Sequence, residues 1–446
     1  MTFMRERWAR NDHEASRQLE GDLTEGSDII VLGAGVVGIT TAWELARRGH
    51  GVTVIDRQTE PATGASHANG AQISPSEAVP WASPSNLRLA LAWMRQADGP
   101  FKLRLTADSR QWWWLLRFLA SCREDVWRRN ARRMVRLALA SQRRLDEIVE
   151  EVRPEFDRER RGILRVYDSD AALREAEGIV DFMAPLGVGL RAVGPDEILD
   201  IEPALGAAIA SGAVAGGLYA ESDESGDAQA FTRALAHAAA GLGVRTVLGQ
   251  QVERIDTHGD RFHSVVAGGV RHMADHLVIC LGLDTPPLTR SLGFDLPIYP
   301  LKGYSATLRL AATNSAPRVS VTDETRRMVV SRLGDRIRVA GKADLVGHDA
   351  RLDPRRAEQL VRDLRRIYPD LDHDGPPEFW AGLRPMTPTG VPIIGRSPVD
   401  RVYLNTGHGS LGWTMACGSA VLIADLLEGR NGELDPADYE SGLPAD

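Results

Sequence analysis

The sequence predicts an α/β fold, α+β overall, in which a parallel-sheet nucleotide domain is interleaved with a second domain of antiparallel sheet plus helices. Apolar runs at 28–32 and 52–55 flank a helical pattern at 36–48, which predicts a β-α-β unit. A helical block at 87–152 and short strands between 298 and 340 follow along the chain. Because both ends of the chain alternate strands with helices, we expect the nucleotide domain to be discontinuous.

The other elements are predicted from the spacing of their apolar residues. A long helix is indicated by apolar residues that recur at steps of three and four: Trp127, Ala131, Met134, Ala138, Leu145, Ile148 and Val152. Further helices are predicted at 169–186, 228–242, 354–367 and 413–427. Further strands are predicted at 163–167, 244–248, 277–281, 298–310, 318–321, 328–332 and 336–340.

Composition excludes several classes of protein. The 446-residue chain has a formal net charge of −8, so no basic surface for nucleic acid is expected. Cys122, Cys280 and Cys417 lie far apart, which predicts neither a disulfide framework nor a metal site.

Residues 1–27 carry no apolar core of a secretory signal, and we expect a mobile N-terminal extension. No run of 18 apolar residues occurs, so a cytoplasmic protein is expected.

A dinucleotide motif lies between the first strand and the first helix. Gly33, Gly35 and Gly38 form G-x-G-x-x-G, with Val36 and Val37 at the start of the helix. The first glycine allows a tight turn, the second lets a pyrophosphate approach the backbone, and the third lets the helix pack on the sheet. The helix N-terminus then offers N–H groups to the phosphates.

An acidic residue follows at the distance that such a fold requires. Asp56 ends the second strand, eighteen residues after Gly38, where a ribose-binding carboxylate belongs, and Arg57 comes next. An acid at this place favours an unphosphorylated ribose, as in FAD or NAD. The motif alone leaves these two cofactors open.

Six segments extend the pattern to most of the chain: VLGAGVVG (31–38), VTVIDR (52–57), ANGAQISP (68–75), YPLKGYS (299–305), GLRPMTPTGVPIIGR (382–396) and LNTGHGSLGWTMACGS (404–419). On these segments the chain resembles the D-amino-acid-oxidase-like superfamily of flavoenzymes, and within it the D-amino acid dehydrogenases. The resemblance runs from Ile29 to about Gly429. It implies noncovalent FAD, with NAD as the alternative.

A second glycine-rich turn, at 407–412, precedes the last helix and agrees with a flavin. Its N–H groups and the helix dipole can stabilise the negative charge of a reduced flavin. The predicted contacts are Gly409, Leu411, Gly412, Trp413 and Thr414. The resemblance further implies contacts from Ser66, His67, Asn69, Gly70, Gln72, Val252 and Gly282. The loop after Asp56 departs from the dehydrogenase pattern at Ser76 and Glu77, where a Gly-Tyr pair is usual. This departure leaves open which substrate side chain is preferred.

The resemblance also indicates a substrate site. Arg384 occupies the position at which related amino acid oxidases bind the substrate carboxylate, and a guanidinium suits that role because it donates two parallel hydrogen bonds. Lys302 and Tyr304 are expected to contact flavin or substrate from a strand that covers the flavin, with Tyr299 as a weaker candidate. His408 is as much a structural candidate as a functional one.

The expected reaction is oxidation of a D-amino acid at Cα, with hydride transfer to the flavin and passage of electrons to a quinone or another acceptor. Alternatives are an oxidase that uses oxygen on D-amino acids, glycine or sarcosine, a D-proline or D-hydroxyproline dehydrogenase, and an electron-transfer subunit without an amino acid site. Trp112, Trp113 and Trp114, followed by an arginine-rich helix, also suggest peripheral contact with a membrane. The alternative is that these tryptophans pack in the core.

The order of strands and helices along the chain predicts two interleaved domains. The FAD-binding domain is expected at 28–85, 205–285 and 380–446, and the substrate domain at 86–204 and 286–379.

Overall fold

The computed structural model describes residues 26–93, 99–311 and 316–440, apart from the side chains of 91 and 92. Its first sheet has six strands in the order β19-β20-β13-β1-β2-β9, and all neighbours are parallel except β19 and β20. These strands are β1 (Asp28–Leu32), β2 (Gly51–Asp56), β9 (Arg245–Leu248), β13 (His276–Ile279), β19 (Ile393–Arg396) and β20 (Val402–Thr406). The sheet therefore collects both ends and the middle of the chain.

Alternation along β1 explains why this sheet is covered on both faces. Ile29 and Val31 point into a core made with helices, whereas Ile30 and Leu32 point into a core on the opposite face. The helical face is covered by α2 (Val36–Arg47), α5 (Glu124–Val152), α9 (Ala228–Gly241) and α12 (Gly412–Glu428). The other face is covered by α10 (Thr285–Ser291) and by the antiparallel strands β10 (Val252–His258), β11 (Arg261–Ala267) and β12 (Val270–Met273).

A second, mixed sheet has nine strands, in the order β18-β14-β17-β16-β15-β5-β7-β6 with β4 paired to β17. They are β4 (Phe101–Leu103), β5 (Ile163–Tyr167), β6 (Arg191–Val193), β7 (Gly216–Ala220), β14 (Tyr299–Leu310), β15 (Ser320–Asp323), β16 (Met328–Leu333), β17 (Arg336–Leu345) and β18 (His373–Met386). A short pair, β3 (Gln72–Ile73) and β8 (Glu224–Ser225), completes the strands of the described residues.

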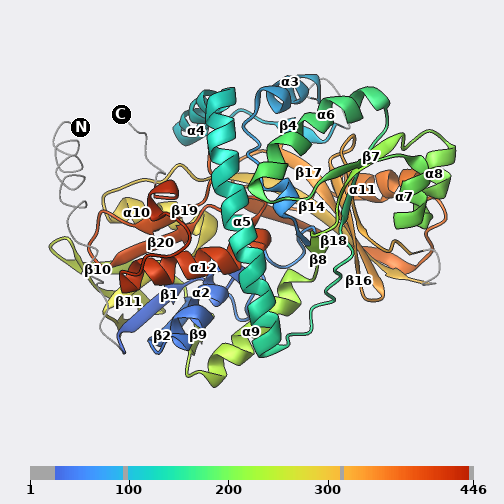
Figure 1. Ribbon diagram of the computed structural model, residues 1–446. Coiled ribbons are helices and arrows are strands. Elements are labelled where there is room, and N and C mark those ends of the chain that lie inside the picture. Colours follow the sequence, from blue (N-terminus) through green and yellow to red (C-terminus); the bar gives the residue numbers. More distant parts are fainter. Residues whose placement is uncertain (1–25, 94–98, 312–315, 441–446) are drawn as a thin grey trace.

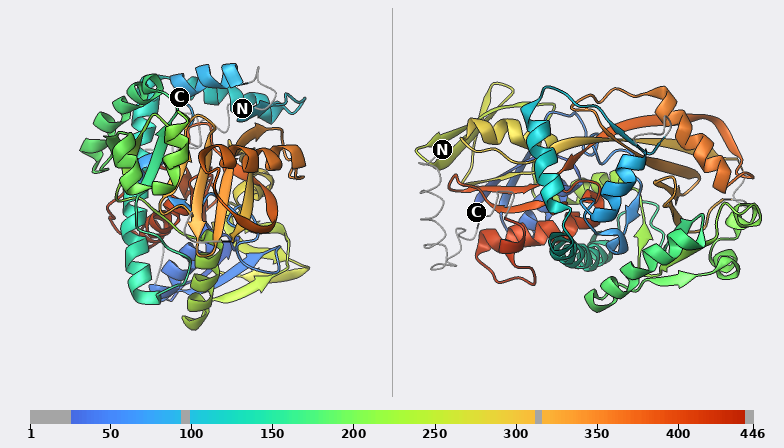
Figure 2. Two further views of the ribbon diagram at one scale, coloured as in Figure 1. Left: turned by 90° about the vertical axis from the view of Figure 1, so that its right-hand side faces the viewer. Right: turned by 90° about the horizontal axis from the view of Figure 1, so that it is seen from above.

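The remaining helices lie around the mixed sheet and at one end of the molecule. They are α3 (Pro84–Trp93), α4 (Ser109–Ser121), α6 (Asp170–Met183), α7 (Pro195–Ile201), α8 (Gly206–Ala210) and α11 (Pro354–Ile367). Figure 1 shows α3 and α4 together at the top, and the long helix α5 between the parallel sheet on the left and the mixed sheet on the right. Seen from above in Figure 2, α5 is viewed end-on beside α12.

The predicted fold class is confirmed, and some details differ. The block at 87–152 is not continuously helical, because β4 at Phe101–Leu103 adds an edge strand to the mixed sheet. The meander at 252–273 and the long strand β18 were not predicted, since neither has a clean alternation of apolar and polar residues. Extended pairing over the whole of β14, rather than propensity, makes β18 a strand despite its three prolines.

The sheets also shift the expected domain boundaries. β7 pairs with β5 and β6 in the mixed sheet, so the segment around Gly216–Ala220 lies with the second sheet and not with the nucleotide domain. The boundary at 380 falls inside β18. We propose a division into two domains that follows the two sheets. The predicted N-terminal extension, residues 1–27, lies almost entirely outside the described residues, as do residues 441–446.

Across the described ranges, none of the helices has the length and apolar content needed to span a membrane. The same ranges hold no group of three or more His, Cys, Asp or Glu side chains placed to bind a metal ion. The three cysteines are free thiols.

Candidate functional site

One large cavity, of about 770 Å³, lies between the two sheets and is lined by residues of both. Its walls include the loops after β1, β2 and β13, that is, the carboxyl ends of the parallel strands. The opposite wall comes from β14, β17 and β18 of the mixed sheet. Ligands of open α/β sheets bind at the carboxyl ends of the strands, so this cavity is the candidate site.

The first glycine turn is built as the motif predicts. Gly33 has φ +107° and lies close to the end of the neighbouring strand β13. A Cβ at Gly33 would be 2.7 Å from the carbonyl oxygen of Cys280. At Gly38 a Cβ would come within 1.8 Å of the carbonyl oxygen of Gly33, so only glycine lets α2 pack here. Gly35 faces the cavity, and a Cβ there would meet only Ser66 Oγ, at 3.5 Å.

Two side chains hold the backbone of this turn. Asp56 accepts hydrogen bonds from the N–H of Ala34 at 2.6 Å and from the N–H of Gln58 at 2.8 Å. Ser66 Oγ accepts from the N–H of Val36 at 3.1 Å. Arg57 forms an ion pair of 2.9 Å with Asp284 at the exposed edge of the cavity. These hydrogen bonds fix the backbone conformation at the start of α2.

The loop after β2 lines the cavity as expected. Asn69 Oδ1 accepts from the N–H of Ala71, which closes an Asx turn. The carbonyl oxygen of Gly70 accepts from Ser331 Oγ at 2.8 Å, which attaches the loop to the mixed sheet. Gln72 Nε2 donates to Ser320 and Thr322. Val36, Val37, Ser66, Val252 and Gly282 are also among the lining residues.

The second glycine turn leads into α12 from the other side of the cavity. Gly407 has φ +76° and Gly409 has φ +58°, both in the left-handed region. A Cβ at Gly409 would be 2.8 Å from Met386 Sδ, so the turn is packed against β18. Gly409, Leu411, Gly412 and Trp413 line the cavity, and the first N–H groups of α12 have no partner within the helix.

His408 lies inside this turn and is buried. Burial lowers its pKa to about 3, so the imidazole is neutral at physiological pH. Its buried Nε2 has no hydrogen-bond partner among the described residues.

Arg384 enters the cavity from β18. Its side chain lies over Gly303 of the neighbouring strand β14, where a Cβ would come within 2.4 Å of the guanidinium. One guanidinium nitrogen donates to the main-chain carbonyl of Lys342 at 3.0 Å, and the group is 5.8 Å from the centre of the Trp81 ring. Burial lowers the pKa of Arg384 to about 10.

No ion pair joins Arg384 to a carboxylate of the described residues, which sets it apart from most arginines of the chain. A guanidinium desolvated in this way gains most from an anionic ligand, because the ligand restores the interactions lost with water. The part of the cavity beside Arg384 therefore suits an anionic group.

Lys302 and Tyr304 are placed differently from the expectation. Successive residues of a strand point to opposite faces, so while Gly303 faces the cavity, its neighbours face α11. Tyr304 Oη donates to Asp344 at 3.1 Å, and Lys302 Nζ lies 5.4 Å from the centre of the Tyr304 ring. Lys302 does not line the cavity, and Tyr304 has its hydroxyl behind the wall. A catalytic contact of either side chain is not supported.

Three other predicted contacts also lie behind the wall. Gly38 serves the packing of α2 and is not a lining residue. Thr414 Oγ1 accepts from the N–H of Ser74 at 3.2 Å and is almost fully buried outside the cavity lining. His67 bonds Gln229 through Nδ1 at 2.7 Å and is not a lining residue. Tyr299, the weaker candidate, packs against Trp114 and is not a lining residue either. The other predicted contact residues line the cavity, and their contacts with a cofactor stay predictions.

The sequence analysis did not predict one polar group in the wall of the cavity. Glu77 accepts from Thr322 Oγ1 at 2.8 Å, and Arg165 and Arg327 both bond Glu324. These five residues line the cavity. Burial raises the pKa of Glu77. The only signal in the sequence was the unusual Ser76-Glu77 pair, because the other members come from distant strands.

Ser76 explains the other half of that pair. Its hydroxyl donates to the buried Asp223 at 2.6 Å, and burial raises the pKa of Asp223 to about 8. The pair holds the 3-10 turn at Pro75–Glu77 against the turn between β7 and β8. Glu77 therefore has a fixed position beside the cavity.

Comparisons with known proteins agree with this geometry. The model of a protein family described as "FAD dependent oxidoreductase" matches residues 28–426. A D-amino acid dehydrogenase of Dechloromonas aromatica (strain RCB) is 46% identical over 413 residues, which cover 91% of this chain and 98% of that protein. A D-amino acid dehydrogenase of Paramagnetospirillum magneticum is 43% identical over 403 residues, which cover 90% and 95%.

Solved structures show the same fold at low sequence identity. Glycine oxidase from Geobacillus kaustophilus has a TM-score of 0.74 at 21% identity, over 93% of this chain and 98% of that one. L-proline dehydrogenase from P. horikoshii has a TM-score of 0.73 at 19% identity, over 94% and 97%.

Proposed function

The chain belongs to the family of FAD-dependent oxidoreductases, and we propose that it oxidises D-amino acids to 2-oxo acids and ammonia. The substrate class rests on the resemblance to D-amino acid dehydrogenases over nine-tenths of the chain. The carboxylate site at Arg384 supports it, because every amino acid offers a carboxylate next to the carbon that is oxidised.

The residues of the cavity fit FAD. Gly33 and Gly38 allow the strand, turn and helix to approach closely, and the open N-terminus of α2 at Gly35 suits a pyrophosphate. Asp56 stands at the end of β2, where it suits a ribose. The N-terminus of α12 beyond Gly409 suits the flavin edge that becomes negative on reduction. A nicotinamide cofactor would not need this second turn.

One observation carries the proposal: the half-buried guanidinium of Arg384 lines the cavity and has no ion-pair partner among the carboxylates of the described residues. The same cavity holds both glycine turns. A subunit that only passed electrons would not need such a group, and its burial would be an uncompensated cost. The electron-transfer alternative leaves Arg384 unexplained.

The chemistry that we propose divides between cofactor and protein. FAD, when bound, supplies a two-electron acceptor for the hydride from Cα. Arg384 binds and orients the carboxylate, and Trp81, over which it lies, helps to exclude water. The substrate amine reacts as the neutral form, so turnover rises with pH. A dedicated base is not required for this reaction.

The decisive experiment is an anaerobic titration of the purified yellow protein with D- and L-amino acids. We expect D-amino acids to bleach the flavin absorbance. Bleaching by L-amino acids at an equal or higher rate would reject the D-preference, and bleaching by neither would favour the electron-transfer alternative. Peroxide formation in air would indicate an oxidase, and a preference for D-proline or D-hydroxyproline would assign that dehydrogenase class.

We further propose that the electrons pass to a quinone and that α4 contacts the cytoplasmic face of a membrane. The helix has two apolar faces. Trp114 is buried and donates to the carbonyl of Met386 at 2.8 Å, whereas Trp112, Trp113, Leu116 and Leu119 form a stripe on the outside. Trp113 is 64% exposed and Leu116 is 58% exposed, which is costly in water and favourable at a lipid interface.

The position of α4 agrees with that role. Phe118 of the same helix lines the cavity, so the stripe lies one helix away from the site. Figure 1 shows α3 and β4 at the same end of the molecule as α4. Leu89 of α3 and Leu105, which follows β4, are both exposed. The arginines of α5 contribute less than expected, because Arg128 pairs with Glu124 and Arg133 with Asp438. The apolar stripe is the main support for this proposal.

A further inference from the structure

The cavity wall beside Arg384 contains an irregularity in the mixed sheet. Between the pairs Lys302–Asp344 and Tyr304–Gly341, the single residue Gly303 of β14 faces two residues of β17, Lys342 and Ala343. This is a β-bulge, and bulges near active sites change the direction of main-chain and side-chain groups. The Arg384 side chain passes over Gly303 at this place.

Lys342 has an unusual backbone within this bulge. Its φ is +63°, in the left-handed region that glycine adopts without strain and a lysine does not. In this conformation its carbonyl oxygen accepts the hydrogen bond from Arg384 at 3.0 Å. The guanidinium therefore reaches from β18 across β14 to the bulge in β17.

The side chain of Lys342 is attached on the other side of the sheet. Its ammonium donates to Asp363 Oδ2 of α11 at 2.8 Å, and the side chain is 2% exposed. The neighbouring Asp344 is attached to the same helix through Arg356. Both residues thus connect the bulge to α11, and such connections can maintain a strained backbone.

We propose that Lys342 and Asp363 are positioning residues for the substrate carboxylate: their ion pair maintains the bulge, and the bulge directs a carbonyl at Arg384. Neither side chain touches the substrate. The Lys342 carbonyl occupies one N–H of the guanidinium and so fixes its orientation. The remaining N–H groups are then available to the carboxylate. The proposal rests on the proposed function of Arg384 and extends it to the layer behind the cavity.

Three substitutions separate an effect through the backbone from an effect of the charge. Lys342→Met keeps most of the apolar side chain but removes the ion pair, and leaves a strained residue without its anchor. Lys342→Gly also removes the ion pair, yet glycine adopts the left-handed conformation without strain. Asp363→Ala removes the partner alone. Glu358→Gln, at an exposed 3.9 Å ion pair with Arg362 on the same helix, is the matched control.

We expect Lys342→Met and Asp363→Ala to raise KM for the D-amino acid by about tenfold, with kcat changed by less than about threefold. Lys342→Gly should stay within about threefold of the wild type in both constants. The double variant Lys342→Met with Asp363→Ala should be no worse than either single variant. FAD content and the control variant should not change.

A second measurement does not depend on turnover. Benzoate, a carboxylate without an α-amine, is titrated into each FAD-loaded variant, and its Kd is read from the flavin absorbance. We expect about a tenfold weaker Kd in Lys342→Met and Asp363→Ala only. If no D-amino acid is oxidised by the wild type, the proposed function fails while this titration still tests the positioning role. Wild-type KM and Kd in both variants, or a Lys342→Gly protein as impaired as Lys342→Met, would overturn the inference.

Discussion

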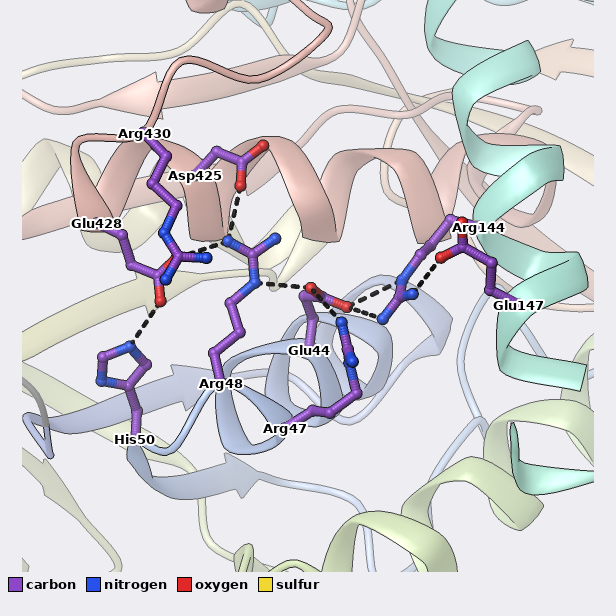
Figure 3. A network of polar contacts seen from close by, with 9 residues as sticks. All are labelled: Glu44, Arg47, Arg48, His50, Arg144, Glu147, Asp425, Glu428 and Arg430. Atoms are coloured by element: carbon purple, nitrogen blue, oxygen red, sulfur yellow. Dashed lines mark hydrogen bonds and ion pairs between the residues drawn. The ribbon is translucent and has the colours of Figure 1, made fainter. Parts of the chain in front are cut away.

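Glu44 of α2 and Arg144 of α5 form a buried ion pair in which two guanidinium nitrogens donate to one carboxylate oxygen, at 2.6 and 3.0 Å. Glu44 is 1% exposed and also accepts from Arg48 at 2.7 Å. Figure 3 shows how Arg48 extends this network to Asp425 and Glu428 of α12. One carboxylate thus joins the helix of the dinucleotide motif to α5 and, through Arg48, to the C-terminal helix.

This arrangement predicts a large loss of stability for Glu44→Gln. The substitution leaves Arg144 without its buried counter-charge, whereas Arg48 keeps Asp425 and Glu428. Removal of one partner of a buried pair typically costs about 3–5 kcal/mol. Denaturant unfolding of the FAD-loaded protein measures the effect. Glu147→Gln is the control, because Glu147 bonds the same Arg144 from an exposed position and should cost less than about 1 kcal/mol.

The pH dependence of the same variant has a defined sign. The adjacent arginines lower the pKa of Glu44 despite its burial. A carboxyl with a lowered folded-state pKa contributes stability above its unfolded pKa, about 4.5, and loses that contribution as the pH falls through the folded value. The difference in stability between wild type and Glu44→Gln should therefore shrink in acid. A constant difference down to pH 3 would contradict the role of the charge.

A bulky residue at Gly35 should empty the cofactor site and leave the fold intact. A Cβ at this position would meet only Ser66 Oγ, at 3.5 Å, so Gly35→Val extends into the cavity and blocks the pyrophosphate. We expect a soluble, colourless protein with wild-type circular dichroism, measured against the FAD absorbance of the wild type. Full retention of FAD in Gly35→Val would rule out this binding mode. Gly38→Ala should instead impair folding, because its Cβ would overlap the carbonyl of Gly33.

Arg384→Leu should strongly weaken turnover of D-amino acids while FAD stays bound. Loss of a charge-assisted, partly buried contact costs about 2–5 kcal/mol, which lowers kcat/KM by a factor on the order of 30 to several thousand. Arg384→Lys should recover only part of this loss, since an ammonium cannot donate two parallel hydrogen bonds. Arg309→Leu is the control, because Arg309 is an exposed arginine of β14 that pairs with Asp335. Unchanged kinetics in Arg384→Leu would refute the assignment.

Membrane contact predicts sedimentation of the FAD-loaded protein with lipid vesicles. The substitutions Trp112→Ser and Trp113→Ser remove two exposed aromatic side chains of α4 and should abolish binding. Trp43→Ser is not a suitable control because that side chain is buried, so Leu242→Ser, an exposed apolar residue after α9, serves instead. Wild-type protein that stays in the supernatant with anionic vesicles at low salt would reject the α4 contact.

The glycine turns and the residues near them could be predicted from sequence because their chemistry is local. Gly33, Gly35 and Gly38 lie within six residues, and Asp56 lies at the end of the next strand. Each position is required by backbone geometry that any similar β-α-β unit shares. The prediction of FAD and of the fold class is confirmed by the family match over residues 28–426.

The sequence by itself predicted the glycine turn proposed for a dinucleotide and, through the family resemblance, the arginine proposed for a carboxylate. It did not determine which side chains of β14 face the cavity, because one residue's shift in strand register reverses every side chain. The tertiary structure decided that Gly303 faces Arg384 while Lys302 and Tyr304 face α11. It also decided that the carbonyl of Lys342, in a bulge of β17, accepts a hydrogen bond from Arg384 while the Lys342 ammonium pairs with Asp363 of α11, since those residues come together only when three strands and a helix pack.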